Sequence, residues 1–244
     1  MIYQNILAAK KRGEKLLAIL LDPEKADPDL IAESLIKIRN SEVDYIFVGG
    51  STVKEGVTQK LVAKLKQQTS IPIVLFPGHF SQISSQADAI LFLSLISGRN
   101  PEYLINQHVK AVPLIRQSEL EVIPTGYILI DGGKETSVQK ISETLPLSPK
   151  EVQEITDTAC AGMYMGKKII YLEAGSGALN PVQASVIKAV RKNVDIPLIV
   201  GGGIRSEEDL VQAYENGADL VVIGTAFEEN NEILAKIKKN EHIH

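Results

Sequence analysis

The sequence predicts a single (β/α)8 barrel, with one domain over residues 1–244. The length lies close to the roughly 250 residues typical of this fold. Short apolar runs alternate with helical patterns along the whole chain, without a linker or a low-complexity tract between them. The 44% hydrophobic and 23% charged residues are typical of a globular chain with one large core. A doubly wound open sheet is the alternative, because alternation alone does not prove that a sheet closes.

The first half of the chain supplies the first four strands. Residues 1–14 predict a short helix that ends at Gly13 and closes the bottom of the barrel. Continuous apolar runs predict strands at 16–21, 44–48, 71–76 and 89–93. Helical patterns predict helices at 27–40, 53–68 and 101–108. The short polar segment 79–86 predicts a loop or a single helical turn.

The second half supplies the other four strands and a long insert. Strand five is predicted at 121–130, where Pro124 and Gly126 indicate a bend or a bulge. The later strands are predicted at 168–172, 197–200 and 220–223. Helices are predicted at 151–165, from Pro181, from Ser206 and at 226–239. Residues 131–149, rich in Ser, Thr and Pro toward their end, form an insert long enough to be a functional loop.

Glycine loops follow the last two predicted strands. Gly201, Gly202 and Gly203 come after strand seven, and Gly224 and Thr225 come after strand eight. Without a Cβ atom, successive glycines let backbone N–H groups converge on an anion, and a helix starting after Gly224 would add partial positive charge. These two loops commonly hold phosphate in (β/α)8 barrels. A phosphate-carrying ligand is therefore predicted, although a glycine after a strand can also be only a tight turn.

Polar side chains follow several predicted strands, whose carboxyl ends meet at one mouth of a barrel. Asp22 with a nearby hydroxyl suits Mg²⁺, which takes one or two protein oxygens plus substrate phosphates, although Asp22 can also simply cap a turn. Glu173 is the candidate general base for a ligand hydroxyl, and Tyr171 lies on the same face of the strand. Both side chains can alternatively fill the top layer of the barrel. The other predicted rim residues are Ser51, Thr52, Asp131, Lys134, Ser176, Arg205 and Thr225.

Composition argues against several classes of protein. The formal net charge of -4, without a basic face, argues against nucleic acid as the main partner. No apolar run has the length of a membrane span, and the amino end lacks a signal-peptide core, so a cytoplasmic location without stable membrane insertion is expected. The single cysteine, Cys160, excludes a disulfide or a Cys-based zinc site within the chain and suggests a buried structural thiol. His79, His108, His242 and His244 show no metal-ligand spacing.

Five motifs together resemble the geranylgeranylglyceryl phosphate synthase family, including its heptaprenyl-transferring bacterial relatives. They are LLDPEK at 20–25, FVGGST at 47–52, YLEAGSGA at 171–178, VGGGIRS at 200–206 and VIGTAFE at 222–228. The resemblance covers nearly the whole chain, and the third and fourth motifs are its specific part. SLISGRNPEYLI at 94–105 and GYILIDGGKETSV at 126–138 resemble the larger of the two groups in the family.

The resemblance implies a Mg²⁺-dependent prenyltransferase. The C3 hydroxyl of sn-glycerol 1-phosphate would attack C1 of geranylgeranyl diphosphate, with release of diphosphate. Asp22 and Ser51 would hold Mg²⁺, and Glu173 would sit on the glycerol hydroxyl. The resemblance to this family also implies that the protein forms a homo-oligomer. The residues that would hold glycerol phosphate are Tyr171, Leu172, Glu173, Ala174, Gly175, Ser176, Gly177, Gly202, Gly203, Gly224 and Thr225.

The prenyl chain would need an apolar groove across the barrel mouth. We expect the segment after strand three and the insert to border it, with walls from Phe76, Phe80, Phe92, Leu93, Tyr103 and Tyr127. A longer donor such as heptaprenyl diphosphate remains an alternative.

Two other functions remain open on the same scaffold: a phosphosugar or amino-acid-pathway isomerase, lyase or aldolase, and a non-catalytic phosphate-binding barrel. A Schiff-base aldolase would need a lysine at a strand end, and no strand-interior lysine is visible.

Overall fold

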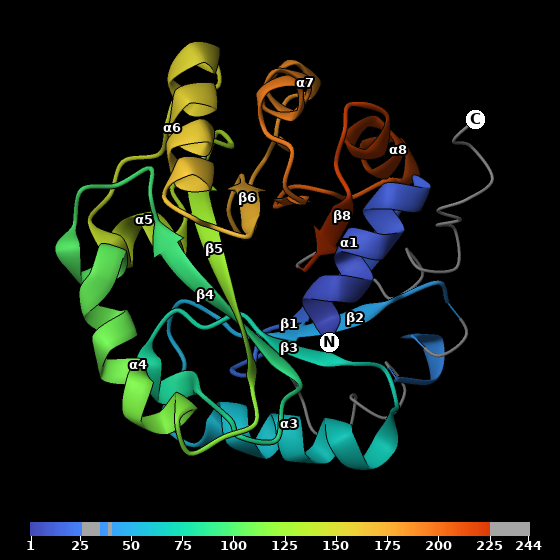
Figure 1. The fold of residues 1–244 in the computed structure, drawn as a ribbon, viewed down its shortest axis with the longest axis vertical. Coiled ribbons are helices and arrows are strands. Elements are labelled where there is room, and N and C mark those ends of the chain that lie inside the picture. Colours follow the sequence, from blue (N-terminus) through green and yellow to red (C-terminus); the bar gives the residue numbers. More distant parts are fainter. Residues whose placement is uncertain (26–34, 39–40, 225–244) are drawn as a thin grey trace.

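Eight parallel strands close into a barrel in sequence order in the computed structural model, which describes residues 1–25, 35–38 and 41–224 (Figure 1). Each strand pairs with the next one along the chain, and β8 returns to β1 with Leu16 opposite Leu220. The strands are β1 (Leu16–Leu21), β2 (Tyr45–Val48), β3 (Ile73–Leu75), β4 (Ala89–Leu95), β5 (Glu121–Leu129), β6 (Ile169–Glu173), β7 (Leu198–Gly201) and β8 (Leu220–Ile223). The predicted barrel is confirmed, and the open doubly wound sheet is excluded.

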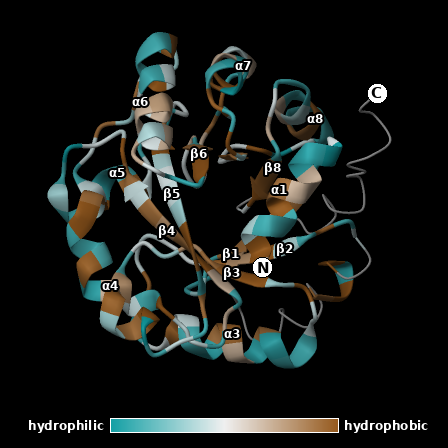
Figure 2. Cartoon of the chain, viewed as in Figure 1, coloured by the Kyte–Doolittle hydropathy of each residue, from teal (hydrophilic) through white to brown (hydrophobic). Residues whose placement is uncertain are grey.

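Helices surround the barrel, and Figure 2 shows that the strands are predominantly hydrophobic while most helices carry hydrophilic outer turns. The described helices are α1 (Ile2–Arg12), α3 (Val57–Gln68), the 3-10 turn η1 (Phe80–Gln82), the π-helix η2 (Glu102–Asn106), α4 (Gln107–Ile115), α5 (Ser137–Ser142), α6 (Val152–Tyr164), α7 (Ala184–Asn193) and α8 (Glu207–Glu215). Residues 35–38 of the helix predicted at 27–40 are helical. Its remaining residues, and the helix predicted at 226–239, lie outside the described part of the chain.

Alternating side chains along each strand build two packed layers. Ile169, Tyr171 and Ile199 point into the barrel interior, whereas Ile170 and Leu172 pack outward against the helices. Helix α1 buries Ile2, Ile6 and Ala9 in the interior layer, and Gly13, with φ of 73°, ends the helix. The predicted closure of the barrel bottom by this helix is therefore confirmed.

The predicted bulge in β5 is wrong. Its pairing with β4 runs without interruption from Ala89 opposite Glu121 to Leu95 opposite Tyr127. The backbone carbonyl of Pro124 points toward β6 and accepts the N–H of Lys168. Because the N–H and the carbonyl of one residue in a parallel strand point to the same side, an N–H at position 124 would face the turn that precedes β6. No ladder hydrogen bond is lost there, and the strand tolerates the proline.

Three helix boundaries differ from the sequence-based expectation. Helix α3 begins at Val57 rather than Val53. Gly56 has φ of 83°, a left-handed conformation, so the helix cannot include the residues before Val57. Helix α7 begins at Ala184, with Pro181 in the preceding loop. The helix predicted at 101–108 continues through η2 and α4 to Ile115. Val109 and Val112 are exposed on its outer surface, which blurs the one-sided apolar pattern that marks a helix.

Within the described ranges, none of the helices combines the length and the apolar character that a membrane crossing requires.

Candidate active site

A polar cavity opens at the carboxyl ends of β1, β2, β6, β7 and β8. Its walls include Asp22 and Ser51 on one side and Tyr171 and Glu173 on the other. Backbone from two glycine-rich loops lines the space between them. The predicted residues that line this polar cavity are Asp22, Ser51, Tyr171, Glu173, Gly175, Ser176, Gly177, Gly202, Gly203 and Gly224. Most residues predicted from distant parts of the sequence are thus brought to one place.

The structure gives different outcomes for the other predicted site residues. The side chains of Leu172 and Ala174 do not line the polar cavity but pack in the outer layer of the core. The backbone N–H of Ala174 donates to the carbonyl of Gly201, so it is already used between strands. Thr225 lies outside the described residues. Of the other rim residues, Thr52 and Arg205 line the cavity, whereas Asp131 and Lys134 are exposed outside it.

Glu173 is a buried acidic side chain of the polar cavity. The strand period points it inward, and its side chain is only 6% exposed. Burial raises the pKa of Glu173 to about 7, and the N–H of Gly175, which donates to Oε1 over 2.8 Å, opposes that shift. A carboxyl group with this pKa can both accept and release a proton near neutral pH, as a general base requires.

Tyr171 lies beside Glu173 and is fully buried. Its hydroxyl is close enough to favour the charged carboxylate of Glu173, but it makes no hydrogen bond of ordinary geometry. A buried hydroxyl without a partner is unusual, since most buried polar groups are satisfied. The Tyr171 hydroxyl is therefore available to a polar group of a ligand in the cavity.

Three glycines next to Glu173 adopt backbone conformations that favour glycine. Gly175, Gly202 and Gly203 have φ values of 97°, 80° and 73°. A Cβ atom on Gly202 would lie 2.3 Å from Glu173 Oε1, and one on Gly175 would lie 2.1 Å from Thr136 Cγ2. The loops therefore present bare backbone toward the cavity. Such a surface can hold a phosphate group.

The Asp22 carboxylate stands on the opposite wall. Its Oδ1 accepts the N–H of Glu24 over 3.1 Å, and its Oδ2 lies 3.9 Å from Lys25 Nζ. A Cβ atom on Gly50 would lie 2.8 Å from Asp22 Oδ1, so the glycine makes room for this carboxylate. Ser51 lines the same cavity directly after Gly50.

These donors fit an incomplete magnesium site. Among the described residues, no group of three or more His, Cys, Asp or Glu side chains is arranged to hold a metal ion. Mg²⁺, however, is commonly bound through one or two protein oxygens together with water and substrate phosphates. Asp22 with Ser51 supplies that kind of donor set beside the glycine loops.

An apolar pocket adjoins the polar cavity. It runs between the segment after β3, strand β4, helix α4 and helix α5 of the insert, and encloses about 820 Å³ of empty space including its opening. All six expected wall residues line it: Phe76, Phe80, Phe92, Leu93, Tyr103 and Tyr127.

The polar cavity and the apolar pocket share one wall. Both are lined by Gly50, Ser51, Phe76, Tyr127 and Val138. A ligand with a charged head and a long apolar tail can therefore occupy both at once.

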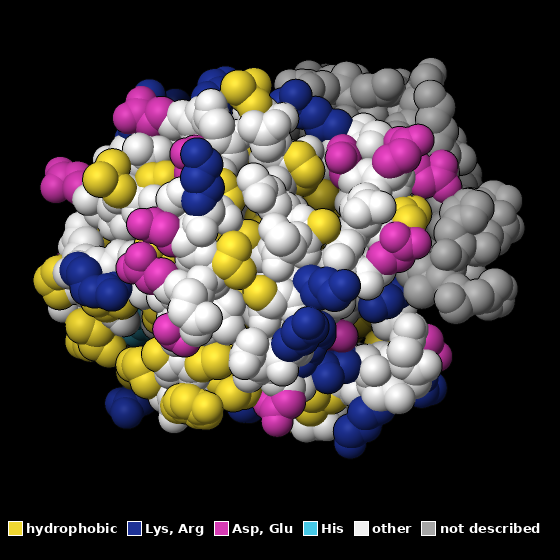
Figure 3. Space-filling view, turned by 90° about the horizontal axis from the view of Figure 1, so that it is seen from above, with side chains coloured by type: hydrophobic (Ala, Val, Ile, Leu, Met, Phe, Trp, Pro, Cys, Tyr) yellow, Lys and Arg dark blue, Asp and Glu magenta, His cyan; other side chains and the backbone are white. Residues whose placement is uncertain are grey.

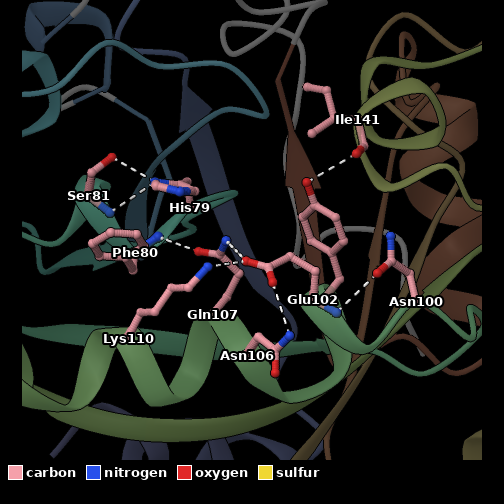
Figure 4. Close-up of polar contacts among 10 residues, drawn as sticks. His79, Phe80, Ser81, Asn100, Glu102, Asn106, Gln107, Lys110 and Ile141 are labelled. Atoms are coloured by element: carbon pink, nitrogen blue, oxygen red, sulfur yellow. Dashed lines mark hydrogen bonds and ion pairs between the residues drawn. The ribbon is translucent and has the colours of Figure 1, made fainter.

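Hydrogen bonds connect the segments that form the walls of the apolar pocket, and Figure 4 shows these contacts. Glu102 accepts hydrogen bonds from Gln107 and Lys110, and Gln107 in turn accepts the N–H of Phe80 over 2.9 Å. The hydroxyl of Tyr103 donates to the carbonyl of Ile141 in α5 over 3.1 Å. These contacts tie the segment after β3 and the insert to the same helix, so three pocket walls are fixed relative to one another.

Two histidines to which the sequence analysis assigned no role in the site lie at this pocket. His79 lines its rim, with Nδ1 2.9 Å from Ser81 Oγ, and His108 lies in its wall against Phe92. His108 is buried, and Nε2 lies 3.2 Å from Ser94 Oγ, which also accepts from Lys167 Nζ. Burial lowers the pKa of His108, and the nearby Lys167 charge adds to the shift. The signal available in the sequence was helical spacing: His108 follows Leu104 by one turn, on the buried side of the helix.

One face of the molecule carries charged side chains of both signs. Figure 3 shows acidic and basic side chains on this face, with several Lys and Arg side chains close together to the right of its centre.

The fold and the two adjoining pockets define the class: a (β/α)8 barrel with a polar cavity beside an apolar pocket at the carboxyl ends of its strands. The model of the PcrB family matches residues 9–241, and the chain belongs to this family.

Relatives with established names agree with this assignment. The chain is 54% identical to a geranylgeranylglyceryl phosphate synthase of Flavobacterium johnsoniae, over 94% of this chain and 95% of the relative. It is 52% identical to the protein of the same name from Zunongwangia profunda, over 93% and 97% of the two chains. Among solved structures, (S)-3-O-geranylgeranylglyceryl phosphate synthase from Thermoplasma acidophilum in complex with sn-glycerol-1-phosphate is similar, with a TM-score of 0.90, 30% identity and coverage of 97% and 95%.

Proposed function

We propose that this protein forms an ether bond between the C3 hydroxyl of sn-glycerol 1-phosphate and the geranylgeranyl group of geranylgeranyl diphosphate, releasing diphosphate. The relatives named above support both substrates, because one solved relative holds sn-glycerol-1-phosphate and the relatives' name includes the geranylgeranyl group. The observation that carries the proposal is the shared wall between the polar cavity and the apolar pocket. A phosphosugar has no apolar part that would occupy a pocket lined by these aromatic and aliphatic side chains.

In the proposed reaction, the glycine loops at Gly175 to Gly177 and Gly202 to Gly203 bind the phosphate of sn-glycerol 1-phosphate through backbone N–H groups. The glycerol hydroxyl then lies at Glu173, which accepts its proton, while Tyr171 orients it. The hydroxyl oxygen bonds to C1 of the prenyl group. The bond from C1 to the diphosphate oxygen breaks, and the electron pair leaves with diphosphate.

Mg²⁺ belongs to the same proposal, with Asp22 and Ser51 as its protein ligands. When bound, the ion would neutralise the negative charge that develops on the leaving diphosphate. The Lys25 ammonium group, on the same wall as Asp22, adds a second positive charge near the leaving group.

The donor is proposed to be geranylgeranyl diphosphate, with heptaprenyl diphosphate as the alternative. The walls of the apolar pocket are buried or half-buried aromatic and aliphatic side chains, which suit any polyprenyl chain. The names of the similar proteins favour the shorter of these two donors.

A homo-oligomer is also proposed. Ile105, Val109 and Val112 follow one another at helical spacing along η2 and α4, and they are 55%, 63% and 36% exposed. A contiguous apolar stripe on an outer helix is typical of a protein contact, and a second copy of this chain is the proposed partner.

One experiment distinguishes prenyl transfer from the alternative functions. The protein is incubated with isotopically labelled sn-glycerol 1-phosphate, geranylgeranyl diphosphate and Mg²⁺, and products are identified by mass spectrometry. We expect a prenyl ether and diphosphate in equal amounts. Conversion of a phosphosugar without any prenyl donor would favour an isomerase or lyase, and ligand binding without any product would favour a non-catalytic barrel.

A further inference from the structure

Aromatic rings gather where the polar cavity meets the apolar pocket. The Phe76 ring centroid lies 5.3 Å from that of Tyr171 and 5.9 Å from that of Tyr127, and the two tyrosine rings lie 5.4 Å apart. Phe76 and Tyr127 are the aromatic residues that line both pockets within the described part of the chain. Their rings therefore border the point at which a charged head and an apolar tail would join.

The Phe76 ring is held in place by its backbone and by a neighbouring ring. Its N–H donates to the carbonyl of Val48 over 2.8 Å. A Cβ atom on Gly49 would lie 1.8 Å from the Phe76 carbonyl oxygen, so strand β2 and the end of β3 are packed backbone to backbone. The Phe47 ring, 1% exposed, stacks on Phe76 with centroids 6.5 Å apart. These contacts fix the backbone at Phe76 and place the Phe47 ring beside its side chain.

Tyr127 adds a second neutral ring. Burial raises the pKa of Tyr127 well above its ordinary value, and the charge of Glu173 adds to this shift. The phenol therefore stays protonated at physiological pH. A neutral phenol ring presents the same electron-rich face as a phenylalanine ring.

The reaction of a prenyl diphosphate concentrates positive charge at this junction. As the bond from C1 to oxygen breaks, the electron pair leaves with diphosphate and the allylic carbons become cationic. The glycerol oxygen then supplies an electron pair to C1, and its proton passes to the Glu173 carboxylate. With the diphosphate in the polar cavity and the tail in the apolar pocket, the allylic carbons lie against the shared wall.

We propose that Phe76 and Tyr127 are catalytic residues whose ring faces stabilise the allylic cation by cation–π interaction. This inference rests on the proposed prenyl transfer. Cation–π attraction is strongest at a desolvated ring; Tyr127 is 5% exposed and Phe76 is half-buried. The interaction grows only as the charge develops, so it raises kcat rather than ground-state affinity.

The test replaces Phe76 with phenylalanines carrying one, two and three ring fluorines in the full-length protein. Each fluorine weakens the electron-rich face while nearly keeping ring shape. We expect kcat for ether formation to fall stepwise, by roughly 10- to 30-fold at three fluorines, while the Kd for sn-glycerol 1-phosphate stays constant. The matched control is the same series at Phe47, which stacks on Phe76 but lines neither pocket, and there kcat stays at the wild-type value.

A second variant guards against misfolding of the fluorinated proteins. Phe76→Leu keeps an apolar side chain of similar size but removes the ring face, and we expect kcat to fall at least tenfold with sn-glycerol 1-phosphate still bound. An unchanged kcat in both the fluorinated series and Phe76→Leu would overturn the inference while leaving prenyl transfer intact. Absence of ether product from the wild-type protein would instead overturn the proposed function itself.

Discussion

The carboxylate of Glu173 lies directly against the α-carbon of Gly201 on the neighbouring strand. A methyl group at Gly201 would lie 2.8 Å from Glu173 Oε2 and 2.5 Å from the Tyr171 hydroxyl. The two residues pair across β6 and β7, so this contact is fixed by strand register. A glycine is required here by contact rather than by backbone conformation, and it determines where the proposed general base can sit.

Gly201→Ala therefore tests the position of Glu173. The added methyl group must displace the carboxylate or the Tyr171 ring, and we expect a loss of about 1–3 kcal/mol in the free energy of unfolding, measured by urea denaturation. Ether formation should fall by at least 100-fold, because a small misplacement of a reacting group is costly. Gly224→Ala is the stability control, since its methyl group would meet Leu20 at an ordinary 3.6 Å. Equal stability of both variants would contradict the close contact.

The raised pKa of Glu173 predicts how activity depends on pH. A general base must be deprotonated, so kcat/KM should rise as pH increases through about 7 and then level off. Glu173→Gln should lower kcat by 100-fold or more while sn-glycerol 1-phosphate still binds. Glu119→Gln, an exposed carboxylate outside both pockets, should keep the wild-type profile. A wild-type profile that is flat between pH 5 and pH 9 would argue against Glu173 as the base.

The same group predicts how stability depends on pH. Its pKa is about 7 in the folded protein and about 4.5 when unperturbed, so the folded state binds the proton more tightly. The stabilisation from that proton is complete below about pH 4.5 and is lost as pH rises through about 7. Because glutamine does not titrate, Glu173→Gln removes this pH-dependent loss of folding stability. Between pH 4.5 and pH 8, the difference in unfolding free energy between variant and wild type should change by an amount on the order of 3 kcal/mol, measured by denaturation at each pH.

Removal of the Asp22 carboxylate tests the proposed magnesium site. Asp22→Asn should raise the Mg²⁺ concentration needed for half-maximal ether formation by roughly 100-fold, because changes even in residues that only support a metal ligand cost 10- to 100-fold. Asp131→Asn is the matched control: this carboxylate is exposed, accepts the N–H of Gly133, and lies outside the polar cavity. An identical Mg²⁺ requirement in the two variants would place the metal elsewhere.

The apolar stripe on α4 predicts the oligomeric state. Val109→Lys places a charge at the most exposed position of the stripe, and we expect sedimentation velocity to show a shift from an oligomer toward the monomer. Gln67→Lys introduces the same charge on exposed surface of α3 and should leave the oligomer intact. A wild-type protein that sediments as a monomer would exclude the proposed contact.

Most of the barrel could be predicted because its strands are buried on both faces. The apolar runs at β1 and β8 have the predicted bounds, since each is flanked by polar or glycine residues. The helix through α4 was predicted too short because it carries apolar residues on its outer surface, which blur the one-sided apolar pattern. Pro124 indicated a bulge only because the sequence does not show which neighbour its missing N–H would face.

The site was predictable where it follows strand period and chain order. Tyr171 and Glu173 share an inward face because they are two residues apart, and the sequence alone shows this. The outward packing of Leu172 and Ala174 follows from the same two-residue period. They were predicted as ligand-binding residues because the family motif at 171–178 was taken as a whole, without separating the inward from the outward side chains. The contact between Glu173 and Gly201 and the unpartnered Tyr171 hydroxyl depend on register between strands, which no local pattern contains.

The most direct test of the account is a product assay across donor lengths. Labelled sn-glycerol 1-phosphate is offered with geranyl, farnesyl, geranylgeranyl and heptaprenyl diphosphates, each with and without Mg²⁺, and initial rates of ether formation are compared. The account predicts a Mg²⁺-dependent ether product that forms fastest from geranylgeranyl diphosphate. No ether product from any donor, with sn-glycerol 1-phosphate still bound by the protein, would contradict it.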